Sequence, residues 1–185
     1  MDSATAKRVE PRLADIPDGD APPPKTSLPS SSADIQDENQ DVFEQRLLET
    51  FLSLLQEPER INGADQQLRV GFKFNEYLYL SEERVRQILA DRLQAPRLAT
   101  ARMGGGRYVL SSKLAEILNT EGVLFRTHGK KTLAPNAALF KMKMTDPRTG
   151  REVTNWPAVF VLFAGKLGLS TLEDARFPVT SLEPR

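Results

Sequence analysis

The clearest structural signal in the chain lies at residues 139–163, which read LFKMKMTDPRTGREVTNWPAVFVLF. Over 139–144 lysines alternate with Phe and Met, so one face is charged and the other apolar, as in a half-buried strand. The sequence DPRTG at 146–150 has Pro and Gly where a tight turn uses them. Apolar residues return over 153–163, and Pro157 indicates a break or bulge there. This stretch therefore predicts a β-hairpin.

Well before the hairpin, the pattern at residues 41–56 predicts an amphipathic helix. Asp41 and Glu44 have the spacing of a capping box, and apolar residues then recur at helical spacing. Polar and apolar residues alternate over 68–74, which is typical of a half-buried strand. A second short apolar run at 78–80 follows a turn. We therefore expect one helix followed by two short strands.

Two further helices are expected between these strands and the hairpin. Ser81 is a favourable N-cap for a helix over 81–94, which ends before a proline. A short strand at 108–110 is expected to lead into the other helix. The pair Ser111-Ser112 is expected to cap that helix, and Gly122 has the position of a C-terminal glycine.

The two ends of the chain differ from this middle part. Residues 1–40 hold six of the 13 prolines and more acids than bases, a composition that cannot bury a core. We expect this segment to be disordered, either as a solvating leader or linker or as an acidic segment that masks a basic body. The folded domain is expected to span 41–176, with a short strand at 123–125 and a short helix at 170–173. Residues 177–185 are expected to be loose.

Several classes of function lack the residues they need. The chain has no cysteine and one histidine, which excludes disulfides, thiolate metal sites and sites that need two imidazoles. No apolar run approaches the ~18 residues of a membrane span. The glycine run at 104–106 lacks the spacing of a phosphate loop, and no pair of carboxylates suggests acid–base catalysis. We therefore expect a cytoplasmic protein that is not an enzyme, with no cofactor, no metal and no membrane contact.

The charge of the chain is balanced in total but not along its length. The sequence has 25 basic and 25 acidic residues, yet residues 84–151 hold fourteen bases and only four acids. Such a density of positive charge is costly unless an anion shares the surface, and nucleic-acid phosphate is the commonest such anion. A solvated basic face without a ligand is the alternative interpretation.

The elements and the charges together predict an α+β fold. Three helices, short strands and a C-terminal β-hairpin are the parts of a winged helix, here preceded by the disordered tail. In that architecture a helix N-terminus and a basic loop or hairpin contact DNA, mainly through phosphates. We expect the bases at the start of the third helix, in the loop after it and on the outer face of the hairpin to contact phosphate: Arg102, Arg107, Lys113, Arg126, His128, Lys130, Lys131, Lys141 and Lys143. The third helix has few side chains suited to reading bases, so weak sequence preference is expected.

Two other interpretations remain open. A protein-interaction adaptor of similar fold would use exposed apolar residues around Trp156 and Phe160 to dock a partner, although a lone Trp on a hairpin more often closes the core. An RNA-binding version of the same module cannot be separated from the DNA-binding one by sequence, and DNA is expected as the partner ahead of RNA.

Several short motifs carry a resemblance to a known family. The run at 51–55, the pair Ile61-Asn62, Val70 and the step from 78 to Ser81 are similar to the C-terminal domain of TraI-type relaxases of conjugative elements. The resemblance covers residues 43–163. It departs at residues 90–106, which resemble an insertion, and in the composition of the basic loop. The resemblance implies an accessory DNA-binding module of a mobile genetic element, with no nicking activity, because the family's catalytic part is a separate histidine-rich domain.

Overall fold

The computed structural model describes residues 32–125 and 139–185. This part of the chain forms three α-helices: α1 (Ser32–Leu55), α2 (Glu82–Arg92) and α3 (Val109–Thr120). It also forms five strands: β1 (Gly71–Phe74), β2 (Tyr77–Ser81), β3 (Leu139–Thr145), β4 (Glu152–Phe163) and β5 (Val179–Pro184). The strands make one antiparallel sheet, so the expected α+β class is confirmed.

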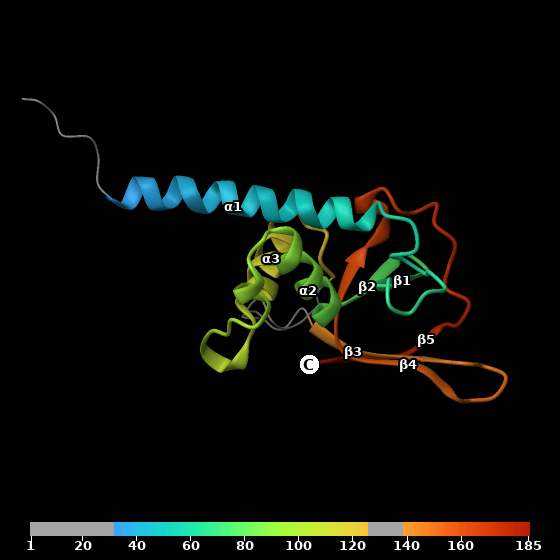
Figure 1. Ribbon diagram of the computed structural model, residues 1–185. Coiled ribbons are helices and arrows are strands. Elements are labelled where there is room, and N and C mark those ends of the chain that lie inside the picture. Colours follow the sequence, from blue (N-terminus) through green and yellow to red (C-terminus); the bar gives the residue numbers. More distant parts are fainter. Residues whose placement is uncertain (1–31, 126–138) are drawn as a thin grey trace, which may run out of the picture.

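The sheet has the strand order β1-β2-β4-β3-β5. The predicted hairpin is confirmed as β3 and β4, joined by a turn in which the Gly150 N–H donates to the Asp146 carbonyl at 2.8 Å. The bulge expected at Pro157 is also present, because Phe140 pairs with Val159 while Met142 pairs with Trp156. Figure 1 shows α1 lying across α2 and α3, with the sheet beside these helices.

Apolar side chains fill both faces of the sheet. Leu78 and Phe160 lie on one face and join a core with α1, α2 and α3. Tyr79 and Val161 lie on the other face, and the C-terminal segment 175–182 packs partly buried apolar residues against that cluster. Because both faces of β4 are covered, its residues 158–162 are all buried, and β4 anchors the hairpin to the rest of the domain.

Two of the expected helix starts are wrong. The first helix begins at Ser32 rather than at Asp41, so the last residues of the segment expected to be disordered are helical. The short strand expected at 108–110 is absent, because α3 already begins at Val109. Tyr108 makes only an isolated bridge with Arg102.

The expected caps had mixed outcomes. Ser81 is confirmed as the N-cap of α2, because its side chain accepts from the Arg84 N–H at 3.5 Å. Ser111 and Ser112 do not cap α3; they lie inside its first turn and are buried. Gly122 follows the last turn of α3 with a φ of 66°, as a C-terminal glycine should.

The C-terminal part also differs from expectation. Residues 177–185, expected to be loose, contain β5, which pairs with β3 along the edge of the sheet. Residues 170–173 form turns rather than a capped helix, and the short helical segment lies earlier, at Ala164–Leu167. Residues 123–125 contribute only the isolated bridge between Leu124 and Leu162. These differences arise because pairing with β3 and β4 organises segments whose own sequence signals are weak.

Gly71 provides a test of how closely β1 and β2 pack. A Cβ at this position would lie 2.4 Å from Leu80 Cδ2 and 2.7 Å from the Tyr79 carbonyl oxygen. Gly71→Ala should therefore lower the free energy of unfolding by about 1–3 kcal/mol, measured by urea denaturation. Gly165→Ala is the matched control, since a Cβ there meets nothing within 4 Å. Equal stability of the two variants would contradict this packing.

Candidate nucleic-acid interface

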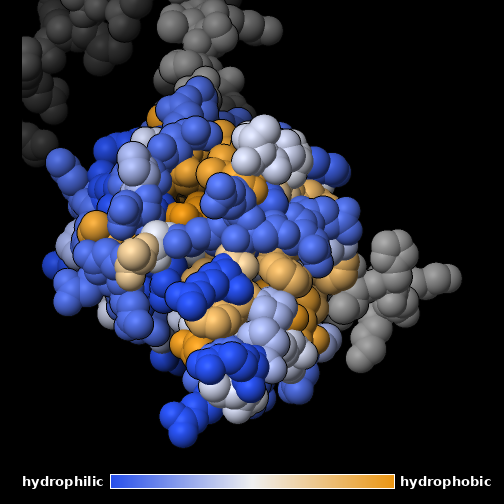
Figure 2. All heavy atoms as spheres, turned by 90° about the vertical axis from the view of Figure 1, so that its right-hand side faces the viewer, coloured by the Kyte–Doolittle hydropathy of each residue, from blue (hydrophilic) through white to orange (hydrophobic). Residues whose placement is uncertain are grey.

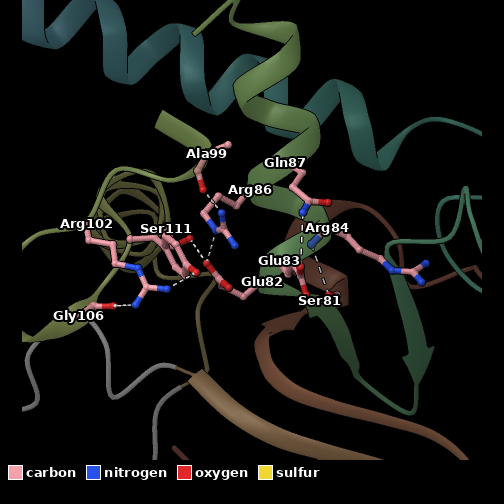
Figure 3. Close-up of polar contacts among 11 residues, drawn as sticks. Ser81, Glu82, Glu83, Arg84, Arg86, Gln87, Ala99, Arg102, Gly106 and Ser111 are labelled. Atoms are coloured by element: carbon pink, nitrogen blue, oxygen red, sulfur yellow. Dashed lines mark hydrogen bonds and ion pairs between the residues drawn. The ribbon is translucent and has the colours of Figure 1, made fainter. Parts of the chain in front are cut away.

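A buried polar network joins the start of α2 to the start of α3. Glu82 is 3% exposed and Arg86 6% exposed, and their Oε1 and Nε atoms are 2.9 Å apart. Ser111 donates its hydroxyl to the same Glu82 oxygen, and a guanidinium N–H of Arg86 donates to the Ala99 carbonyl. Figure 3 shows these four residues converging from three segments of the chain. The network fixes the segment before α3 relative to α2.

Tyr108 contacts both Arg86 of this network and Arg102, and so positions the side chain of Arg102. The guanidinium of Arg86 lies 3.5 Å from the centroid of the Tyr108 ring, and that of Arg102 lies 4.5 Å from it. Arg102 also donates to the Tyr108 hydroxyl at 2.7 Å and to the Gly106 carbonyl at 3.3 Å. An exposed cation is thus held in place by a half-buried ring and a turn rather than by a carboxylate.

A cavity of about 320 Å³ opens beside this network, at the start of α3. Its basic lining residues are Arg102, Arg107 and Arg185. Arg107 donates its Nε–H to the Gly104 carbonyl at 3.2 Å. Among the described residues, none of these three arginines makes an ion pair with a side-chain carboxylate. The apolar part of the lining comes from α3 and the sheet: Ala115, Leu139 and Phe160.

The face of β3 that lines this cavity continues toward the hairpin turn. Leu139 lies at the cavity, and Lys141 and Lys143 follow on the same face because side chains alternate along a strand. Both lysines are exposed, as the sequence predicts. Lys141 pairs in register with Glu183 of β5, and Lys143 Nζ lies 3.4 Å from Glu152. Lys143 is therefore partly neutralised. Lys141 lies opposite a carboxylate but makes no ion pair within the described residues, so its charge extends the basic face.

The hairpin turn adds two exposed arginines, Arg148 and Arg151. Asp146 holds the turn, accepting from the Arg148 backbone N–H at 2.9 Å through its side chain and donating its own N–H to the Arg151 carbonyl at 2.9 Å. These bonds use the backbone of both arginines and leave their guanidinium groups at the surface. Figure 1 places this turn on the side of the molecule away from α1.

Lys113 is placed differently from the other predicted contacts. Its Nζ lies 2.7 Å from Glu44 of α1 and 3.5 Å from Glu116 of α3. The hydrogen bond with Lys113 holds the pKa of the Glu44 carboxyl below its ordinary value, and the same bond raises the pKa of Lys113. The charge of Lys113 is thus used to join α1 to α3, and the sequence could not reveal this because Glu44 lies far away along the chain.

The contact between Glu44 and Lys113 predicts a pH dependence of stability. A carboxyl whose folded pKa is lowered contributes stability above its ordinary value of 4.5, and this is lost as the pH falls through the folded pKa. In Glu44→Gln the stability should therefore decline less below about pH 4.5 than in the unmodified chain, measured by urea unfolding at several pH values. Identical acid profiles would show that the contact contributes nothing.

Four predicted site residues lie outside the described residues: Arg126, His128, Lys130 and Lys131. Of the five inside, the structure brings Arg102 and Arg107 together at the cavity and continues this face with Lys141. Sequence reasoning missed Arg185, Arg148 and Arg151 as members of the same surface. Arg148 and Arg151 could have been found from the sequence, because they are basic residues at a predicted turn. Arg185 is brought to Leu139 only by the pairing of β5 with β3.

The alternative adaptor interpretation placed an exposed apolar docking site around Trp156 and Phe160, but Phe160 is not exposed. Phe160 is 1% exposed and belongs to the core between sheet and helices. Trp156 is half-buried, and its ring lies 5.0 Å from that of Phe72. Figure 2 shows one side of the molecule, on which hydrophilic residues separate the apolar areas.

Comparison with protein-family models, curated proteins and solved structures gave no match. Within residues 32–125 and 139–185, no group of three or more His, Asp or Glu side chains is placed to hold a metal ion. In the same part of the chain, no helix combines the length and apolar character that crossing a membrane requires. The geometry of the basic surface is therefore the basis for assigning a function.

Proposed function

We propose that this chain is a non-catalytic DNA-binding module that contacts mainly the phosphate backbone. One observation carries the proposal: among the described residues, cations that make no ion pair with a carboxylate side chain lie at the cavity, on the exposed face of β3 and in the hairpin turn. This basic surface consists of the cavity arginines, the outer face of β3 and the hairpin turn: Arg102, Arg107, Arg185, Lys141, Arg148 and Arg151. Such a surface attracts a polyanion such as DNA. The release of counterions from the DNA on binding would supply most of the affinity.

The order of the elements supports a winged-helix-like architecture for this module. A winged helix combines three helices with a short sheet that ends in a hairpin. Here β2 precedes α2, α3 precedes the hairpin of β3 and β4, and β2 pairs with β4. In the proposed binding mode the turn at 146–151 serves as the wing on the phosphate backbone.

The exposed face of α3 favours weak sequence preference. Its exposed polar side chains include Glu116 and Asn119, and Lys113 is held by carboxylates. A carboxylate on this face repels phosphate, and no cluster of Arg, Asn or Gln is present there to read base edges. Phosphate contacts from the basic surface would therefore position the protein without selecting a sequence.

The process that this module serves is proposed from the resemblance to TraI-type relaxases alone. In that setting it acts in the cytoplasm as an accessory to conjugative DNA transfer. The described residues offer no metal cluster for nicking, and the proposed role requires none.

A salt titration tests the proposal. If the basic surface contacts roughly five phosphates, log K for a duplex oligonucleotide should fall with log salt at a slope of about −4 to −5. Fluorescence anisotropy with a labelled duplex at several salt concentrations gives this slope. Binding that is weak and independent of salt would overturn the proposal and favour a protein-interaction adaptor, whose partner would then have to dock elsewhere than on Phe160.

A further inference from the structure

Beyond phosphate contact, we propose that the cavity at the start of α3 receives a single unpaired nucleotide of a DNA strand. The inference rests on the proposed function, because it names the form of DNA that the same basic surface prefers. It would make the module bind duplexes with a single-stranded end more tightly than blunt duplexes.

The size and shape of the cavity carry the first step. Its volume of about 320 Å³ lies at the lower end of the range for small-ligand sites, about 300–1,000 Å³. A base pair within a stacked duplex cannot enter a concave site of this size, whereas one nucleotide outside the stack can. Phosphates of a regular duplex would instead stay at the mouth of the cavity and along the exposed side chains of Lys141, Arg148 and Arg151.

The lining divides into a charged part and an apolar part, as a nucleotide requires. Arg102 and Arg107 supply cations for the phosphate, and neither is committed to a carboxylate among the described residues. The half-buried side chain of Leu139 lines the same cavity and offers an apolar contact to a base, with the buried Ala115 and Phe160 behind it. Such contacts tolerate any base, which agrees with the weak sequence preference proposed above.

The cavity also has fixed polar groups at its lining. Glu82 reaches it from α2 and is already neutralised by Arg86 at 2.9 Å, so it does not cancel the charge of the other arginines. Because Glu82 is buried and hydrogen-bonded by Ser111 as well, the shape of the cavity is set before any ligand binds.

The test compares two oligonucleotides of the same duplex sequence, one blunt and one with a single-stranded overhang. Anisotropy titrations at one salt concentration should give at least about fivefold tighter binding to the overhang. Arg107→Ala should remove this preference by deleting a phosphate contact of the cavity. Leu139→Trp should remove it by filling the cavity, while affinity for the blunt duplex stays within about twofold. Arg148→Ala is the matched control, since it should lower the affinity for both oligonucleotides by the same factor.

The outcomes separate the two proposals. Failure to bind either oligonucleotide overturns the proposed function and this inference with it. Equal affinity for the two overturns the inference alone and leaves duplex binding intact. Equal affinity together with binding of free thymidine 5′-monophosphate, detected by chemical-shift changes of the cavity residues, would show that the cavity takes free nucleotides instead. A preference for the overhang that survives in both cavity variants would also overturn the inference.

Discussion

Glu82→Ala is expected to lower the free energy of unfolding by about 3–5 kcal/mol. The substitution leaves the guanidinium of Arg86, which is only 6% exposed, without its carboxylate partner in an interior of low dielectric. It also removes the acceptor of the Ser111 hydroxyl. Urea denaturation followed by circular dichroism measures the loss. A decrease below about 1 kcal/mol would show that water or a rearranged side chain replaces the carboxylate.

Two controls separate the buried charge from the general effect of losing an ion pair. Lys143→Ala removes an exposed pair, with side chains 51% and 42% exposed, and should cost at most about 1 kcal/mol. The double variant Glu82→Leu with Arg86→Met removes both charges at once. It should be more stable than Glu82→Ala, because no unpaired charge remains buried.

Reversing both charges of the hairpin turn, Arg148→Glu with Arg151→Glu, is expected to weaken duplex binding by about tenfold or more at low salt. The salt dependence should also become shallower, with the slope of log K against log salt reduced by about 2. Both arginines are exposed, and the bonds that hold the turn use only their backbone atoms. Loss of affinity would therefore reflect the removed cations rather than a misfolded hairpin.

The matched control for this variant is Arg46→Glu. Arg46 is exposed on α1, which lies on the side of the molecule away from the hairpin turn. The net charge changes in the same direction, so a long-range effect of total charge would weaken binding in both variants. An equal loss of affinity per reversed charge in the two proteins would show that the turn is not a contact.

Much of the secondary structure could be predicted because its signals are local. The alternation at 139–144 and the turn at 146–150 define the hairpin within one short stretch, and Ser81 caps α2 through a residue three positions away. The weak elements were missed. β5 has little alternation of its own and is organised by its hydrogen bonds to β3.

The start of α3 shows the limit of local reasoning about serine residues. Ser111 and Ser112 match the composition of an N-cap, yet both are buried inside the first turn. Ser111 instead donates to Glu82, which is 29 residues earlier in the chain. The hydroxyl of Ser111 is thus used in a contact between two helices, and no local pattern in the sequence indicates that contact.

For the candidate site, the sequence by itself determined that positive charge is concentrated between residues 84 and 151, since charge density needs no folding to be counted. Only the tertiary structure decided which of these charges remain available. It pairs Lys113 with Glu44 and Lys143 with Glu152, and it brings Arg185 beside Leu139. The physical reason is that an ion pair depends on distances of a few ångströms between segments far apart in the chain, which only the folded backbone sets.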